Sequence, residues 1–544
     1  MIKILKIFMK KREKVAESQI IKFKNIKLDI KVRIMKATET VIISQEELSI
    51  DELVSIARFD APIVISNESK NIMKHSRDLI DSFVSEKKIV YGVTTGVGDN
   101  SKTKIKTDES KDLQKNLIRS HASGVGNPLE KELVKAVMVM MIKNLSLGYS
   151  GISLTTVEAL VNLVNLNIIP KVPREGSPGY LIYQSHIALV LIGEGEAYFQ
   201  GELLDGETAL KKGGLSPISL DEKEGLSLIN GSVDMTAIGA IAVYDAINIL
   251  KTSDVVSAVS FEALKGTYYA FDNRIGDVKP HKGVKATLSN LNKLLSDSEI
   301  AEKYKDFRTQ DALSIRAIPQ VHGACKDTLN YVKQVIEIEM NSATDNPLIF
   351  FTDSDSISSA NCHGESVAMA LDFLAISLSE IANISERRIF RLLSTQYSEL
   401  PPFLVEDSGV NSGYMIPQYV AATLVSDNKR YSQPSVVDSI PTAAGQEDHI
   451  SMGTSAALKL LKIIINTQRI LGIELMCGCQ GLDFLRPLRS SSSLEFIYAT
   501  VRSYVPQLSE DRILYNDIEE MEMMIKKETI VNQIESKLGQ LVIG

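Results

Sequence analysis

Four long segments in the second half of the chain repeat their apolar residues with the spacing of an amphipathic helix. They span residues 226–250, 320–341, 365–393 and 449–475, with apolar residues at i, i+3, i+4 and i+7. Segments of this length in one chain favour a helical bundle over short globular helices. We therefore predict a mainly α fold with a long antiparallel central helical bundle.

The chain before the bundle has a mixed pattern. Short apolar runs at 41–43 and 88–91 predict strands, whereas 129–143 and 154–166 predict helices, and residues 197–204 predict a hairpin at Gly201-Glu202. We divide the chain into a basic N-terminal extension (1–36), a mixed α/β N-terminal region with lid and active-site loops (37–225), the central bundle (226–480) and a helical C-terminal region (481–544).

Composition narrows the possible partners and surroundings. A net charge of −8 spread over 544 residues argues against nucleic acid as a partner. Four cysteines in a chain this long indicate a reducing compartment, and the Cys477/Cys479 pair has no second pair with which to hold a metal. Because no run approaches roughly 18 uninterrupted apolar residues, we expect no membrane span and a cytoplasmic protein.

Several motifs follow one another along the chain. A glycine-rich loop, Tyr91-Gly92-Val93-Thr94-Thr95-Gly96-Val97-Gly98, lacks the Lys-Ser or Lys-Thr pair of a phosphate loop. Further on come Arg119-Ser120-His121, Leu228-Ile229-Asn230-Gly231-Ser232, a run from Arg308 to Gly323, Asn361-Cys362-His363-Gly364 and Gln446-Glu447-Asp448-His449. Taken alone, each has an ordinary structural explanation: a glycine turn, a hydrogen-bonded histidine, a helix-start turn, a surface ion pair or a polar cluster.

In this order and spacing the motifs resemble the histidine and phenylalanine ammonia-lyases, over roughly residues 40–500. The resemblance implies that Tyr91 removes the β-proton of a free aromatic amino acid and that Arg316 clamps its carboxylate. It also implies that His121 faces the substrate ring, as in histidine- or tyrosine-preferring members, and that Asn230 binds the electrophile's carbonyl or the substrate carboxylate. The remaining contacts that it implies come from Gln310, Asn361 and Glu447.

The chain departs from the family in the segment that forms the electrophile. Where the family has Gly-Ser-x-Gly-Ala-Ser-Gly-Asp-Leu, this chain runs from Gly176-Ser177-Pro178-Gly179 directly into Tyr180-Leu181. The family's Ala-Ser-Gly triplet cyclises to a methylidene-imidazolone, and Pro178 has no amide hydrogen to lose in such a cyclisation. We expect no such cofactor here, unless an already cyclised triplet is missing from the written sequence.

Two further departures affect side chains of the site. Leu313 stands where the family has a catalytic tyrosine, and Cys362 stands where it has a phenylalanine. The resemblance therefore predicts a carbon–nitrogen lyase most like histidine ammonia-lyase, converting for example histidine to urocanate, with its ordinary turnover in question. The alternatives are a catalytically altered or inactive relative that binds an aromatic amino acid, and a lyase or mutase on another substrate with Tyr91 as base. The resemblance also implies a homotetramer whose sites each draw on three subunits.

Overall fold

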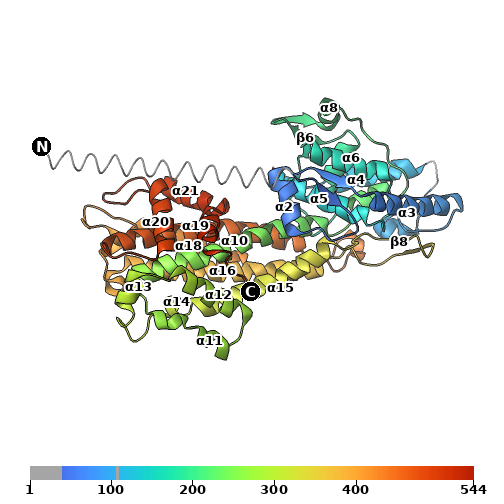
Figure 1. The fold of residues 1–544 in the computed structure, drawn as a ribbon. Helices are drawn as coiled ribbons and strands as arrows, with labels where there is room; N and C mark the ends of the chain where they lie inside the picture. The colour runs from blue at the N-terminus through green and yellow to red at the C-terminus, as the bar shows by residue number, and fades with distance from the viewer. Residues whose placement is uncertain (1–38, 106–108) are drawn as a thin grey trace.

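The computed structural model describes residues 39–105 and 109–544, so the predicted basic extension at 1–36 lies outside the described residues. The described chain is mainly helical, with an N-terminal region seated at one end of a long bundle (Figure 1). The elements of the N-terminal region are β1 Val41–Ile43, α2 Ile50–Phe59, β2 Ile63–Ile65, α3 Asn67–Ser85, α4 Ser110–His121, β3 Val125–Pro128, α5 Lys131–Ser146, α6 Leu154–Asn165, β4 Ile169–Pro170, β5 Pro173–Glu175, α7 Ile182–Leu191, β6 Glu196–Phe199, β7 Glu202–Asp205 and α8 Gly206–Lys212.

The rest of the chain is built almost entirely from helices. They are α9 Glu224–Ile229, α10 Val233–Ala263, α11 Asn273–Val278, α12 Lys282–Leu294, α13 Glu299–Tyr304, α14 Leu313–Arg316, α15 Ile318–Met340, α16 Glu365–Leu393, α17 Thr395–Ser398, α18 Met415–Tyr431, α19 Gly453–Phe484, α20 Ser492–Tyr504, α21 Tyr515–Lys526 and α22 Thr529–Leu538, with one hairpin of β8 Leu348–Phe350 and β9 Asp355–Ile357.

The core of the bundle is formed by α10, α15, α16 and α19, which pack against one another. Helix α10 is buried along nearly its whole length, as expected for a helix that is apolar on all sides. Helix α15 runs antiparallel to α10, because the Ser232 hydroxyl at the start of α10 donates to Glu339 near the end of α15. Helices α10, α16 and α19 run in the same direction, because Gly364 and Gly453 at the starts of α16 and α19 lie against Met235 at the start of α10, and Gly481 near the end of α19 lies against Ala263 and Leu392.

Many of the predicted elements are confirmed. The strand at 41–43, the helices at 129–143 and 154–166 and the hairpin at Gly201-Glu202 correspond to β1, α5, α6 and β6–β7. The predicted strand at 88–91 is wrong. Val93 and Thr94 both donate their backbone N–H to the Val90 carbonyl, so the chain turns there instead of extending.

The predicted helix at 226–250 is interrupted. Helix α9 ends at Ile229, and α10 begins four residues later at Val233. Gly231 adopts a φ of 97°, which favours glycine, and its N–H donates to the Asn230 side chain at 3.0 Å. This break places Asn230 between two helices instead of within one.

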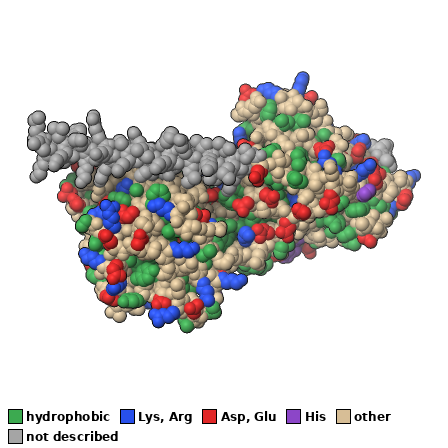
Figure 2. Space-filling model, viewed as in Figure 1, with side chains coloured by type: hydrophobic (Ala, Val, Ile, Leu, Met, Phe, Trp, Pro, Cys, Tyr) green, Lys and Arg blue, Asp and Glu red, His purple; other side chains and the backbone are tan. Residues whose placement is uncertain are grey.

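Two helical stretches of the described residues have the length and apolar composition of a membrane span. They are 224–263, whose most apolar window is 100% buried in the protein, and α16, whose window is 72% buried. Both belong to the bundle core. Where Figure 2 shows the described residues, basic and acidic side chains are interspersed, with no continuous basic area among them of the kind that binds nucleic acid.

Candidate active site

Three long helices begin side by side at one end of the bundle. Gly364, just before α16, and Gly453, the first residue of α19, both lie against Met235 in the first turn of α10. A Cβ added at Gly364 or Gly453 would come within 2.3 or 2.2 Å of the Met235 sulfur, so glycine permits this close approach. The positive ends of three helix dipoles therefore face one space, which favours an anionic group there.

The turn at residues 176–180 lies on these helix starts. The buried Ser177 hydroxyl is 3.1 Å from Asp234 and 3.2 Å from the Thr454 hydroxyl, and Thr454 itself donates to Asp234 at 2.8 Å. Burial raises the pKa of Asp234. A Cβ at Gly179 would come within 2.8 Å of Ser451 Oγ, so the turn packs tightly. It ends at Tyr180, and α7 begins two residues later.

Two phenols, a thiol and a carboxylate gather beside this turn. The Tyr180 hydroxyl donates to Glu447 Oε2 at 2.8 Å, and the Tyr91 hydroxyl accepts the Gly98 N–H at 2.8 Å. Burial is the main cause that raises the pKa of both tyrosines, and Glu447 and Cys362 add to it. Burial also raises the pKa of the Cys362 thiol to about 11. At neutral pH both phenols and the thiol are therefore protonated.

Asn230 is held by a buried polar network. Its Nδ2 donates to Asp345 Oδ1 and to the Asn346 carbonyl, each at 3.0 Å. Asp345 is in turn paired with Lys223 at 2.6 Å, and both side chains are fully buried. These contacts fix the orientation of the Asn230 amide, and in this single chain both of its hydrogen-bonding ends are engaged.

His121 and Asn361 lie on segments around the same end of the bundle. His121 is the last residue of α4, and its Nδ1 is 2.7 Å from the Leu117 carbonyl. Because a carbonyl can only accept, Nδ1 carries the proton and Nε2 remains available to a ligand. Asn361 is exposed, and its Nδ2 lies 3.3 Å from the Ala343 carbonyl.

Gln310, Leu313 and Arg316 lie far from this cluster in the single chain. The Arg316 Nε donates to the Asp311 carbonyl at 2.9 Å. The Asp311 carboxylate is paired with Arg308, which lies 3.9 Å from Glu399, a residue just beyond the C-terminal end of α16. Cys362 lies just before the N-terminal end of the same helix. A helix of 29 residues is roughly 40 Å long. Figure 1 accordingly shows α14 at the opposite end of the bundle from α4. Leu313 is 63% exposed.

The sequence did not indicate that Tyr180 would bind Glu447; its only signal was that a phenol replaces the family's acidic residue. Likewise, the positions of His363, Glu365 and His449, whose ligand-type atoms all lie within 4.8 Å of one another, emerge only from the fold. Cys477 and Cys479 are free and fully buried in α19. The absence of a metal site stays a prediction.

Comparison with known proteins gives a consistent result. The family described as aromatic amino acid lyase matches residues 48–503. A histidine ammonia-lyase of Alkaliphilus oremlandii is 48% identical over 471 residues, covering 86% of this chain and 93% of that protein. The crystal structure of histidine ammonia-lyase from Trypanosoma cruzi has a TM-score of 0.86 at 39% identity, covering 92% and 95% of the two chains. The ergothioneine-degrading enzyme ergothionase from Treponema denticola has a TM-score of 0.86 at 28% identity, covering 91% and 100%.

Proposed function

This chain belongs to the aromatic amino acid lyase family, and we propose that it binds a free aromatic L-amino acid of the histidine class and turns it over slowly by the family's ammonia elimination. The relatives named histidine ammonia-lyase support the choice of substrate class. His121, with a free Nε2, and Glu447 are the groups suited to an imidazole ring, because a desolvated polar ring needs hydrogen-bond partners. The observation that carries the slow turnover is Pro178 in the turn at the helix starts.

The residues of this turn do not fit the family's self-made electrophile. If Ser177 is taken as the family's serine, the nitrogen that must close the ring belongs to Pro178, which has no hydrogen to lose. If instead Tyr180 is aligned with the family's aspartate, the triplet becomes Ser177-Pro178-Gly179, and its middle residue lacks both the amide hydrogen and the β-hydroxyl. In either alignment the methylidene cannot form, and loss of a covalent catalyst removes a large part of the rate.

Without the electrophile, Tyr91 faces most of the barrier. Its raised pKa means that the phenol is protonated at neutral pH, so it is a poor base in this state. The three convergent helix starts favour an anionic group in the space that they face. The pocket therefore favours binding and charge stabilisation over expulsion of ammonia.

The proposal requires more than one copy of the chain. Arg316, which would clamp the substrate carboxylate, is roughly 40 Å from Cys362 along α16 of the same chain. A second copy that brings its α14 end to the Tyr91 cluster completes the site. A homotetramer with sites shared between subunits satisfies this requirement. We place this assembly in the cytoplasm.

A second candidate function follows from the same turn. Elimination of a group that leaves more readily than ammonia needs a base at the β-carbon and no electrophile. Pro178 favours this alternative, since it removes only the step that makes ammonia leave. The ergothionase from Treponema denticola supports this alternative, because it has the same fold and is named for the degradation of ergothioneine, which is not histidine, tyrosine or phenylalanine.

Ammonia release with L-histidine, L-tyrosine and L-phenylalanine tests the proposal, together with the thermal midpoint in the presence of each. We expect histidine to raise the midpoint by binding the folded state, with ammonia release several orders of magnitude slower than in a relative with the triplet. If histidine neither raises the thermal midpoint nor releases ammonia, the proposed substrate class is wrong.

A further inference from the structure

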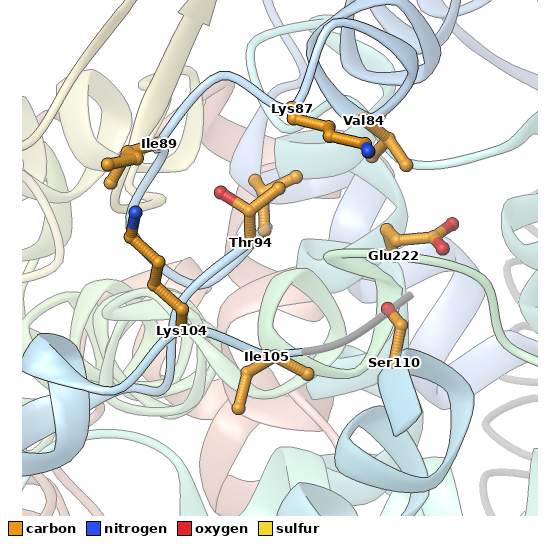
Figure 3. A pocket seen from close by; sticks show the side chains of 9 residues that line it. Val84, Lys87, Ile89, Thr94, Lys104, Ile105, Ser110 and Glu222 are labelled. Carbon is orange, nitrogen blue, oxygen red and sulfur yellow. The ribbon is translucent and has the colours of Figure 1, made fainter. Parts of the chain in front are cut away.

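Buried polar groups gather at two places outside the candidate active site. One is a cavity of about 260 Å³ behind the glycine-rich loop (Figure 3). Its charged groups do not converge, because the Lys104 amine lies beside Ile89, and the Glu222 carboxylate is the charged group nearest the Ser110 hydroxyl. The cavity therefore offers a charged ligand no common set of partners. The other place lies inside the bundle and is organised differently.

Asp254, on α10, is the centre of this second group. His322 Nδ1 lies 2.9 Å from Asp254 Oδ1. Lys326 Nζ and Asn290 Nδ2 donate to Asp254 Oδ2 at 2.6 and 2.8 Å. His322 and Lys326 belong to α15, Asn290 belongs to α12, and all four side chains are fully buried. We call these four residues the buried cluster; it fastens α12 and α15 to α10.

Helices α12 and α15 are also in direct backbone contact. A Cβ added at Gly283, in the first turn of α12, would come within 2.0 Å of the Gly323 carbonyl oxygen on α15. Glycine at both positions permits this approach. The Gly283 N–H also donates to the Asp327 carboxylate on α15 at 2.8 Å. A movement of α12 is therefore passed to α15.

Asn290 also binds the backbone of a segment far along the chain. Its Nδ2 donates to the Val542 carbonyl at 2.9 Å, and its Oδ1 accepts the Val542 N–H at 3.0 Å. Lys326 Nζ lies 3.4 Å from the same carbonyl. A side-chain amide has the donor and acceptor of a peptide group, so Asn290 pairs with Val542 as a residue of a neighbouring strand would. Val542 is 40% exposed, so its backbone makes the attachment.

Residues 540–544, which we call the strap, lie beside α12 and α15 (Figure 1). The strap follows Gly539, whose φ of 73° favours glycine and which turns the chain at the end of α22. Leu541 is buried, and its N–H donates to Glu535 at 3.0 Å. Glu535 is in turn paired with Lys251 of α10 at 2.7 Å. The strap is thus attached at two successive residues.

Asn290 is an unfavourable residue for its position unless the strap is bound. It stands inside α12, where asparagine is a poor helix former, and its amide is completely buried. A buried amide without partners destabilises the fold. Val542 supplies the donor for Oδ1 and one of the two acceptors for Nδ2. The amide of Asn290 is therefore matched to the strap.

The helix held in this way has Arg316 at its start. Arg316 ends α14, and helical hydrogen bonds continue into α15: the Ala317 N–H donates to the Leu313 carbonyl at 2.9 Å, and the Val321 N–H donates to the Ala317 carbonyl at 3.0 Å. His322 follows Arg316 within roughly 9 Å of helix. We infer that the strap positions Arg316, because it holds α15 against α10 and α12 through Asn290 and the buried cluster. The inference rests on the proposed function only for the role of Arg316 in binding the substrate carboxylate.

Hydrogen exchange of the full-length protein tests whether the strap holds α15. Val542→Pro removes the N–H that Asn290 accepts, whereas Val542→Ala keeps it and is the matched control. We expect the amides of residues 320–326 to exchange about tenfold faster in Val542→Pro than in Val542→Ala, under conditions in which both are folded. Asn290→Ala, which leaves the strap sequence intact, should show the same increase. The amides of α7, in the N-terminal region, should exchange alike in all of these proteins.

Ligand binding tests whether the strap acts through Arg316. Histidine has a carboxylate, and histamine lacks it. We expect Val542→Pro to weaken histidine binding by about tenfold, relative to Val542→Ala, and to leave histamine binding unchanged. In a protein that already carries Arg316→Ala, Val542→Pro should not weaken histidine binding further, because the two changes act on one contact.

The outcomes separate this inference from the proposed function. The inference is overturned if residues 320–326 exchange alike in Val542→Pro and Val542→Ala. It is also overturned if Val542→Pro weakens histidine and histamine binding equally, since a general loss of structure would do that. If the unmodified protein does not bind histidine at all, the proposed function fails, and hydrogen exchange still decides whether the strap holds α15.

Discussion

The phenol of Tyr180 donates a 2.8 Å hydrogen bond to the carboxylate of Glu447, across 267 residues of sequence. Tyr180 stands where the family resemblance calls for an aspartate. A carboxylate there would repel Glu447, whereas a phenol donates to it. The acid that the resemblance assigns to the substrate is therefore engaged by the protein itself.

Removing this donor should strengthen histidine binding. In Tyr180→Phe, Glu447 loses a partner that competes with the substrate's imidazole or ammonium group, so we expect histidine to bind up to about tenfold more tightly by calorimetry. Tyr269→Phe is the matched control, because the exposed Tyr269 also donates to a carboxylate, that of Asp306, at 3.0 Å. Unchanged or weaker binding in Tyr180→Phe, relative to this control, would show that Glu447 does not meet the substrate.

Residual elimination should increase with pH. Burial raises the pKa of Tyr91 above its ordinary value of 10.0, so the phenolate fraction grows throughout the range between neutral pH and pH 10. We expect the rate to increase about tenfold per pH unit over that range, and Tyr91→Phe to abolish the increase. A rate that levels off before pH 10 would mean that another group is the base.

Histidine binding should depend on Arg316 and on assembly. We expect Arg316→Ala to weaken histidine binding by about 100-fold, since it removes a charge-assisted pair with the carboxylate. Arg274→Ala, an exposed arginine paired locally with Asp272, is the control. Light scattering gives the assembly state of the same samples, and we expect histidine binding only in samples where the protein is assembled. A monomer that binds histidine with full affinity would contradict a site shared between copies.

Stability should decrease as the pH rises through the titration of Glu262. Burial raises the pKa of Glu262 from 4.5 to about 7, so the folded protein holds a proton that the unfolded chain releases. The free energy of unfolding should therefore fall by about 3 kcal/mol as the pH rises from 4.5 to 7. Glu262→Gln removes this contribution, so its stability relative to the unmodified protein should increase over the same range in urea unfolding. An identical pH dependence of both proteins would exclude Glu262 as the cause.

Local periodicity was enough to predict the long helices of the bundle. The predicted helix at 365–393 coincides with α16, because its apolar spacing and its polar ends agree. The interruption at Asn230 escaped periodicity, since apolar residues continue on both sides and only Gly231 signals the turn. The strand predicted at 88–91 was wrong because its apolar residues lead into a turn, in which the Val90 carbonyl accepts the backbone N–H of Val93 and Thr94.

The site was predicted less completely than the fold. Motif order identified Tyr91, Asn230, Cys362 and Glu447, which the structure places at one end of the bundle. Motif order could not separate them from Arg316, because position along the chain does not reveal which end of a long helix a residue reaches. Nor could it pair Tyr180 with Glu447, a contact that exists only once α7 and the segment before α19 are folded together.

The central claim is that the turn at Ser177-Pro178-Gly179 carries no electrophile, and the mass of one peptide tests it most directly. Trypsin should release residues 175–211 as a single peptide, because no lysine or arginine lies between Arg174 and Lys211. We predict a mass equal to that of the unmodified sequence. A peptide lighter by two water molecules, with the loss located at residues 177–179, would show that the ring forms and would contradict the account.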